Sequence, residues 1–209
     1  FTIENGSREL SLVRQENGKV VNSVIHTLTR DSENERQRIT QTSLLDMSLR
    51  FNPDLIVVGE MRGSEAYAAL EAALTGIGVL TTIHATSCDA AYRRMIALCK
   101  RAVDMSDETL MAYVTEAYPL VAFCKQLENK QRRIMEIMEC EILPDGTRNF
   151  RPLFRYHVVE NRMEHGKFII TGEHGGVRPI SESLQRRLLE NGMPQTTLNR
   201  ILSMGGEAA

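Results

Sequence analysis

The chain of 209 residues is 42% hydrophobic, which is enough for one large domain or two small ones with a buried core. Lysine and arginine (25) nearly balance aspartate and glutamate (27), and the formal net charge of −2 argues against bulk attraction to nucleic acid or to an anionic membrane. No apolar run approaches the roughly 18 residues that a membrane-spanning helix requires.

The four cysteines, Cys88, Cys99, Cys124 and Cys140, are widely spaced and form no C-x-x-C pair. This spacing favours reduced, mostly buried thiols over disulfides or a zinc site.

The first residues suggest a fragment whose earlier elements have been removed. Residues 1–3 read as a strand already in progress, without an initiating Met, and Glu4 follows directly. The phosphate-binding pattern G-x-x-x-x-G-K-[ST] is absent, since the two Gly-Lys pairs, which begin at Gly18 and Gly166, are not followed by Ser or Thr. We therefore expect no phosphate cradle of that type in this chain.

Turn and cap residues divide the segment before the first strongly apolar strand. Asn17-Gly18 is typical of a hairpin turn, here between strands over residues 10–13 and 20–25. A polar loop over residues 30–41 then enters an amphipathic helix with Thr or Ser cap candidates, and Pro53 ends this helix.

The stretch from Phe51 to Ser87 predicts a strand, a helix and a second strand. Leu55–Val58 is a short β-branched apolar run typical of a buried parallel strand. Ser64 is a candidate N-cap for an Ala-rich helix to about Leu74, and residues 79–83 form the second β-rich run. A helix between two strands predicts a right-handed crossover that joins parallel neighbours.

This arrangement places polar residues just beyond the carboxyl ends of strands. Glu60 and His84 follow the two predicted strands, and Glu4 follows the strand at the start of the chain. Ligands of open α/β sheets bind in the crevice outside these strand ends. We therefore expect two carboxylates and an imidazole to face one ligand.

In the remaining chain, the sequence pattern changes at Pro119 from predicted helices to predicted strands. Before it, the pattern predicts two helices, one from about Ser87 to Ala102 and one that opens at Ser106. After it, turn signals separate four strand-like runs that predict an antiparallel meander, over residues 120–127, 133–143, 150–159 and 167–171. Two helices are then predicted, one over 181–191 and a short one after Pro194, before a disordered tail over 205–209. We expect two domains, residues 1–119 and 120–209.

Three segments in this order resemble the secretion ATPases, the hexameric P-loop motors of type II and type IV secretion and of type IV pilus assembly. The segments are FTIE over residues 1–4, RFNPDLIVVGEMRG over 50–63 with Thr75-Gly76, and TTIHA over 81–85. The chain is similar to the branch that drives tight-adherence (Flp-type) pili and to the related conjugation-type ATPases. The resemblance covers residues 1 to about 159 and implies a RecA-like P-loop NTPase core, truncated at its N-terminus, followed by the meander and helices.

The resemblance implies roles for individual residues. Glu4 matches the acidic residue of the Asp box, which orients or deprotonates the attacking water. Glu60 matches the atypical Walker B, in which it holds the Mg²⁺ shell through water and polarises the nucleophile. His84 matches the His box, which senses the γ-phosphate or couples it to subunit motion, and Thr82, two residues before it, is expected to contact the nucleotide.

Two arginines match positions that can neutralise charge on the phosphate. Arg30 lies where an arginine of this family reaches phosphate, and Arg62 follows the Walker B glutamate closely. An arginine finger increases phosphoryl-transfer rates by roughly 10³–10⁵-fold. The departure from the family pattern is the missing Walker A sequence, which we expect upstream of residue 1 in a parent protein.

The resemblance therefore implies the C-terminal part of a hexameric motor that hydrolyses ATP with Mg²⁺. Its expected place is the cytoplasmic face of the bacterial inner membrane, where it works with a membrane platform protein of secretion or pilus assembly. The isolated fragment is expected to be inactive, and no stable binding of nucleic acid is expected.

Each site residue also has a plainer interpretation when it is taken alone. Glu60 can be a solvated loop carboxylate and His84 a structural histidine, and only their joint placement with Glu4 favours a catalytic role.

Two other classes of function stay open. One is a RecA-like nucleic-acid motor, disfavoured by the net charge and by an aromatic content of 5%. The other is a non-catalytic module for ring assembly.

Overall fold

The computed structural model describes residues 1–175 and 178–204, so the predicted disordered tail lies outside the described residues. The chain forms two compact units, each described by itself below. The first comprises residues 1–84 and 91–117, and the second comprises residues 85–90 and the chain from residue 118. No helix in the described ranges is both long and apolar enough to cross a membrane.

A four-stranded parallel sheet lies at the centre of the first unit. Its strands stand in the order β4 (His26–Leu28), β1 (Thr2–Glu4), β5 (Leu55–Val58) and β6 (Gly78–Thr81). The predicted parallel pairing of the strands before and after the Ala-rich helix is confirmed, with Val58 opposite Thr81. All of β1 and residues 56–58 of β5 are buried, as expected for the two central strands of a parallel sheet.

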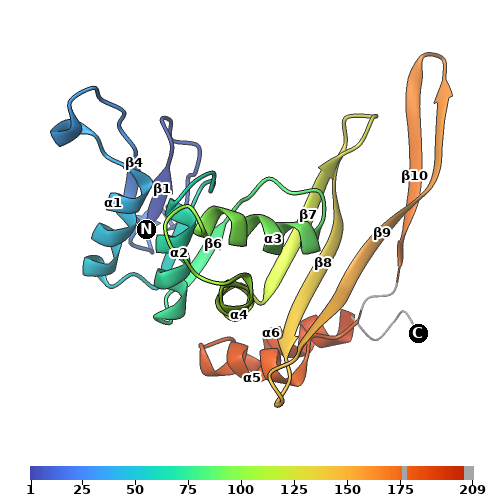
Figure 1. Ribbon diagram of the computed structural model, residues 1–209. Helices are drawn as coiled ribbons and strands as arrows, with labels where there is room; N and C mark the ends of the chain where they lie inside the picture. Colours follow the sequence, from blue (N-terminus) through green and yellow to red (C-terminus); the bar gives the residue numbers. More distant parts are fainter. Residues whose placement is uncertain (176–177, 205–209) are drawn as a thin grey trace. The chain divides into compact units, whose positions relative to one another are not determined.

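Helices pack around this sheet and supply the apolar core. Helix α1 (Gln41–Ser48), extended by the 3-10 turn η2 (Leu49–Phe51), contacts β1 and α2. Helix α2 (Glu65–Leu74) contacts β6 and α4 (Asp107–Ala117), and α3 (Cys88–Cys99) precedes α4 (Figure 1). The core of the first unit includes fully buried residues from the central strands and from these helices: Ile3, Leu45, Ile56, Val58, Leu70 and Leu110.

The predicted turn at Asn17-Gly18 is confirmed, but the strands predicted beside it are wrong: residues 10–13 form no strand, and of residues 20–25 only Val20 belongs to the hairpin. Strands β2 (Gln15–Glu16) and β3 (Lys19–Val20) flank Asn17 and Gly18, which both have positive φ, as a tight hairpin turn requires. The three-residue strand β4 was not predicted, because HTL is neither an apolar run nor a clear alternation. The loop that follows contains one 3-10 turn, η1 (Glu35–Gln37).

Helix α2 begins where predicted, but Ser64 does not cap it. Ser64 has helical backbone angles and its side chain makes no cap hydrogen bond. The carboxylate of Glu65 instead bonds the turn before the helix, since its Oε1 accepts the N–H groups of Arg62 (2.6 Å) and Gly63 (2.7 Å). A carboxylate is favoured there by the positive end of the helix dipole.

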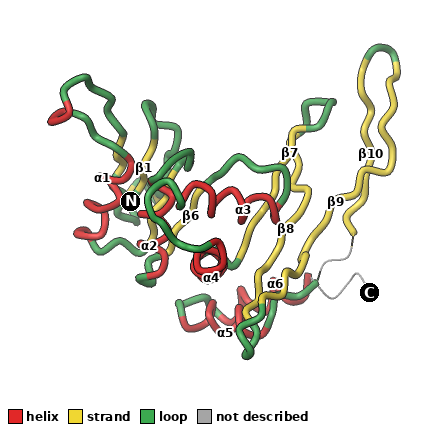
Figure 2. The backbone as a smooth tube through the Cα atoms, in the orientation of Figure 1, coloured by secondary structure: helices red, strands yellow, loops and turns green. Residues whose placement is uncertain are grey.

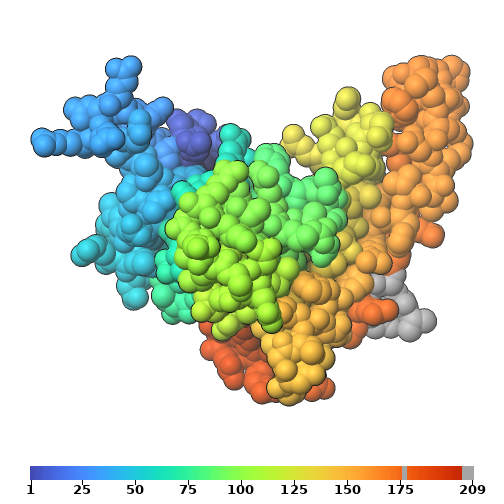
Figure 3. Space-filling view, viewed as in Figure 1, coloured from blue at the N-terminus to red at the C-terminus, as the bar shows by residue number. Residues whose placement is uncertain are grey.

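The predicted antiparallel meander is confirmed in the second unit. Its strands are β7 (Leu120–Gln126), β8 (Arg132–Ile142), β9 (Arg148–Glu164) and β10 (Lys167–Gly175), in the order β10-β9-β8-β7 (Figure 2). Beyond Arg155, β9 pairs only with β10, so these strands continue as a two-stranded ribbon. The orange atoms of this ribbon project from the meander in Figure 3. A small apolar cluster of Leu127, Tyr156 and Ile170 lies where the ribbon leaves the sheet.

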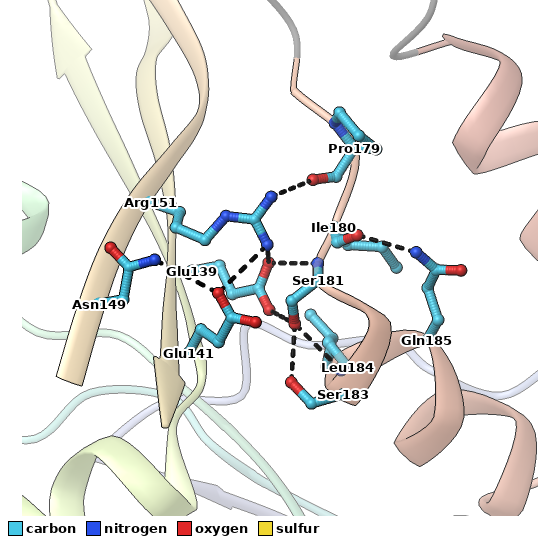
Figure 4. A network of polar contacts seen from close by, with 10 residues as sticks. All are labelled: Glu139, Glu141, Asn149, Arg151, Pro179, Ile180, Ser181, Ser183, Leu184 and Gln185. Carbon is cyan, nitrogen blue, oxygen red and sulfur yellow. Dashed lines mark hydrogen bonds and ion pairs between the residues drawn. The ribbon is translucent and has the colours of Figure 1, made fainter. Parts of the chain in front are cut away.

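Two helices end the described chain, α5 (Glu182–Glu190) and α6 (Gln195–Met204), as the sequence predicted. A buried carboxylate on β8 joins the start of α5 to the meander (Figure 4). Glu139 is 1% exposed and accepts the backbone N–H of Ser181 at 2.9 Å and its hydroxyl. The same hydroxyl caps Leu184, and Arg151 donates to the carbonyl of Pro179 and lies 3.8 Å from Glu139.

This network predicts that Glu139→Ala weakens the attachment of α5. The change removes the carboxylate that accepts the buried N–H and hydroxyl of Ser181, which costs about 2–4 kcal/mol, whereas Arg151 keeps the Pro179 carbonyl and Glu141 as partners. Urea unfolding together with hydrogen exchange at the Ser181 and Leu184 amides measures the loss. Glu160→Ala is the matched control, because Glu160 forms an exposed ion pair with Arg162 on the ribbon and such pairs contribute little. Equal effects of the two changes would contradict this account of Glu139.

Candidate functional site

The polar residues predicted to lie together stand at one edge of the parallel sheet. Glu4 is the last residue of β1, Glu60 follows the end of β5 at Val58, and His84 follows the end of β6 at Thr81. Because the strands are parallel, these carboxyl ends share one edge. The short connection after each strand therefore decides which side chains meet.

Glu60 is in contact with two cationic or potentially cationic side chains. Its Oε2 lies 2.6 Å from Nη2 of Arg62, and its Oε1 lies 2.9 Å from Nε2 of His84. The side chain of Glu60 is 23% exposed, whereas that of His84 is 86% exposed. The carboxylate is thus enclosed by partners that themselves face solvent.

These contacts keep Glu60 ionised. The hydrogen bond from Arg62 lowers the pKa of the Glu60 carboxyl most, and the charges of Arg62 and His84 lower it further. Partial burial opposes this effect without reversing it. A carboxylate that stays charged can accept a proton from water or hold a hydrated cation.

Hydrogen bonds from three distant segments fix the main chain around Glu60. The N–H of Gly59 donates to the carbonyl of Ile3 in β1 at 2.9 Å. Thr82 holds Gly59 and Met61, since its hydroxyl donates to the Gly59 carbonyl (2.6 Å) and its carbonyl accepts the Met61 N–H (3.0 Å). From α1, Nε2 of Gln41 donates to the carbonyl of Glu60 at 3.0 Å.

Glu4 lies beside this segment but points its carboxylate elsewhere. A Cβ at Gly59 would come within 3.7 Å of the Glu4 side chain, so the two residues are neighbours. Oε2 of Glu4 accepts the N–H groups of Glu9 (2.6 Å) and Leu10 (2.8 Å). Burial would raise the pKa of the Glu4 carboxyl, yet these two donors and nearby His26 lower it overall.

The predicted set is therefore only partly brought together. Glu60 contacts both Arg62 and His84, while the carboxylate of Glu4 bonds Glu9 and Leu10. Arg30 is exposed, with Nε donating to the carbonyl of Gln37 at 2.7 Å, and within the described chain it makes no bond to Glu60. The predicted roles of these residues toward nucleotide stay predictions.

Two contributors were not predicted from the sequence. Gln41 lies among the Thr and Ser cap candidates of α1, and nothing in its local pattern pointed to Glu60. Arg101 donates from Nη1 to the carbonyl of Arg62 at 3.0 Å, which ties the Arg62 main chain to the turn after α3. Both links depend on how the helices pack, and helix periodicity carries no signal for them.

The surroundings of Glu60 suit a cation that is bound through water better than one that the carboxylate ligates directly. No group of three or more His, Cys, Asp or Glu that could hold a metal occurs among the described residues. Both oxygens of Glu60 already have a nitrogen partner, and the Arg62 guanidinium disfavours a bare cation. Mg²⁺ keeps several waters and is bound by one or two carboxylates together with phosphates, so one carboxylate contacting it through water fits these residues.

Comparison with known proteins identifies relatives that match part of the chain. A segment of 66 residues, 31% of the chain, is 46% identical to the competence protein ComGA of Streptococcus pneumoniae and covers 21% of that protein. A segment of 119 residues, 54% of the chain, is 29% identical to the type IV secretion system protein PtlH of Bordetella pertussis and covers 35% of it. The chain thus spans between about a fifth and about a third of these relatives.

A solved structure shows a similar partial match. The alignment with the VirB11 ATPase of the Brucella suis type IV secretion system covers 48% of this chain and 32% of the VirB11 chain, at 25% identity and a TM-score of 0.45. The match to a family is far more extensive, since the model of the type II/IV secretion system protein family covers residues 7–198. The chain therefore belongs to the type II/IV secretion system protein family.

Proposed function

We propose that the gene product containing this chain hydrolyses ATP to drive type II/IV secretion or pilus assembly, with Glu60 as the residue that polarises the attacking water. The observation that carries the proposal is the ionised Glu60 carboxylate at the carboxyl edge of the sheet, between Arg62 and His84. Residues 1–209 contain no G-x-x-x-x-G-K-[ST] sequence. The proposal therefore concerns the whole gene product, and residues 1–209 alone are expected to turn over almost no ATP.

The chemistry of phosphoryl transfer matches this arrangement. The reaction needs an oriented water molecule and positive charge around the phosphate oxygens, and little covalent help. Glu60 provides the acceptor for the water proton. Arg62 and His84 provide N–H donors, and their exposed positions let them exchange Glu60 for the oxygens of a bound triphosphate.

The assembly is part of the same proposal. We infer a homo-hexamer that works on a platform protein at the cytoplasmic face of the inner membrane, with ATP and Mg²⁺ and without stable nucleic-acid binding. The name of PtlH, a type IV secretion system protein, supports the secretion role. The net charge of −2 supports a partner other than nucleic acid.

Glu60→Gln in the full gene product tests the assignment of the base. The amide cannot accept the proton, so kcat for ATP should fall by about 10²–10⁴-fold. The Kd for ATP should stay within about threefold, because the base contributes little to ground-state binding. Steady-state ATPase assays and calorimetry measure the two quantities. Glu108→Gln, at an exposed position in the first turn of α4, is the control. Turnover at the wild-type rate in Glu60→Gln would defeat the assignment.

Arg62→Gln tests the electrostatic part of the site through the pH profile. Glu60 acts as a carboxylate, so kcat/KM falls as the pH drops through its pKa in the free enzyme. Arg62 lowers that pKa, and its removal should move the acid limb to higher pH. Arg62→Lys retains the charge and should move the limb less. An acid limb that stays in place or moves to lower pH in Arg62→Gln would show that another group controls it.

A further inference from the structure

The segment that carries Glu60 has glycine at both ends. Gly59 and Gly63 flank Glu60, Met61 and Arg62, and glycine has the most backbone freedom of any residue. A segment of this kind samples many conformations unless other groups hold it. The position of the Glu60 carboxylate therefore depends on what bonds its main chain.

On the sheet side, neighbouring strands hold this segment. The Gly59 N–H bonds to Ile3, and Thr82 binds the carbonyl of Gly59 and the N–H of Met61. These bonds do not involve the carbonyl of Glu60 itself. Gln41 supplies its donor, at 3.0 Å across 19 residues of sequence.

Gln41 is well placed to hold this carbonyl because its own backbone is fixed. It is the first residue of α1 and follows the N-cap Thr40. Thr40 and Ser43 form a reciprocal capping box, with the Ser43 N–H donating to Thr40 Oγ1 at 3.1 Å and the Thr40 N–H donating to Ser43 Oγ at 2.9 Å. Helix α1 also packs on β1, so the Gln41 amide starts from a rigid base.

We propose that Gln41 is a positioning residue for Glu60, acting through the Glu60 carbonyl. This inference rests on the proposed function, because it assigns Gln41 to the same hydrolytic site. Gln41 holds the peptide after Glu60 in one orientation, and that orientation sets where the carboxylate points. Catalytic groups displaced by as little as about 1 Å lose much of their effect.

The test variant is Gln41→Met in the full gene product. Methionine has a similar length and helix propensity but no N–H donor, so helix α1 should be retained. We expect kcat for ATP to fall about tenfold, which corresponds to about 1.4 kcal/mol. KM and the melting temperature should stay close to wild type. Faster hydrogen exchange at the Met61 amide should report the loosened segment without reference to activity.

Gln126→Met is the matched control. Gln126 in the meander also donates its side-chain amide to a main-chain carbonyl, that of Lys130 at 3.2 Å. The same substitution there removes a bond of the same kind outside the proposed site. It should leave kcat, KM and the Met61 exchange rate unchanged.

The outcomes separate this inference from the function on which it rests. If wild type turns over ATP, Glu60→Gln does not, and Gln41→Met keeps the wild-type kcat, the inference is wrong and the function stands. If kcat, KM and the melting temperature all worsen together in Gln41→Met, Gln41 is only structural and the inference is again wrong. If the wild-type gene product hydrolyses no ATP, the proposed function itself fails.

Discussion

The main chain that follows β5 is fixed by bonds from three segments far apart in sequence. Ile3 holds it from β1, Thr82 from beyond β6 and Gln41 from α1. None of these partners is in place until β1, β5, β6 and α1 have assembled. The Glu60 site is consequently a property of the folded sheet, and any change that shifts the strand register also shifts the carboxylate.

Two carboxylates at the same sheet edge are kept ionised by different means, and this separates their roles. Glu4 bonds the N–H groups of the loop that follows β1, which are permanent parts of the main chain. Glu60 bonds the side chains of Arg62 and His84, which can rotate. With Glu4 engaged by its own loop, the edge presents one carboxylate whose partners can be exchanged for those of a ligand.

The sequence predicted the elements whose signals are local and missed those that depend on distant partners. The apolar run Leu55–Val58 defined β5 to the residue, because a buried parallel strand is uniformly apolar. Strand β4 was missed, since its three residues form a strand only by pairing with β1. The ribbon part of β9 was underestimated, because polar residues that pair only with β10 read as a turn.

The site was predictable to the same degree and for the same reason. The sequence predicted that Glu60 and His84 lie at one edge of the sheet, because both follow the ends of predicted strands. The partners of Glu4 and the contact of Gln41 could not be predicted, because they depend on the path of a loop and on the packing of α1.

The exposed fractions of the side chains distinguish the carboxylates further. Glu139 is 1% exposed, with donors from Ser181 at both of its oxygens, and a group so enclosed holds the fold together. Glu60 is 23% exposed and has the 86% exposed His84 as a partner, so a ligand can approach it without unfolding the unit. A charged group that is oriented by fixed main chain yet reachable from solvent is what hydrolysis requires, and among these three carboxylates Glu60 combines both properties.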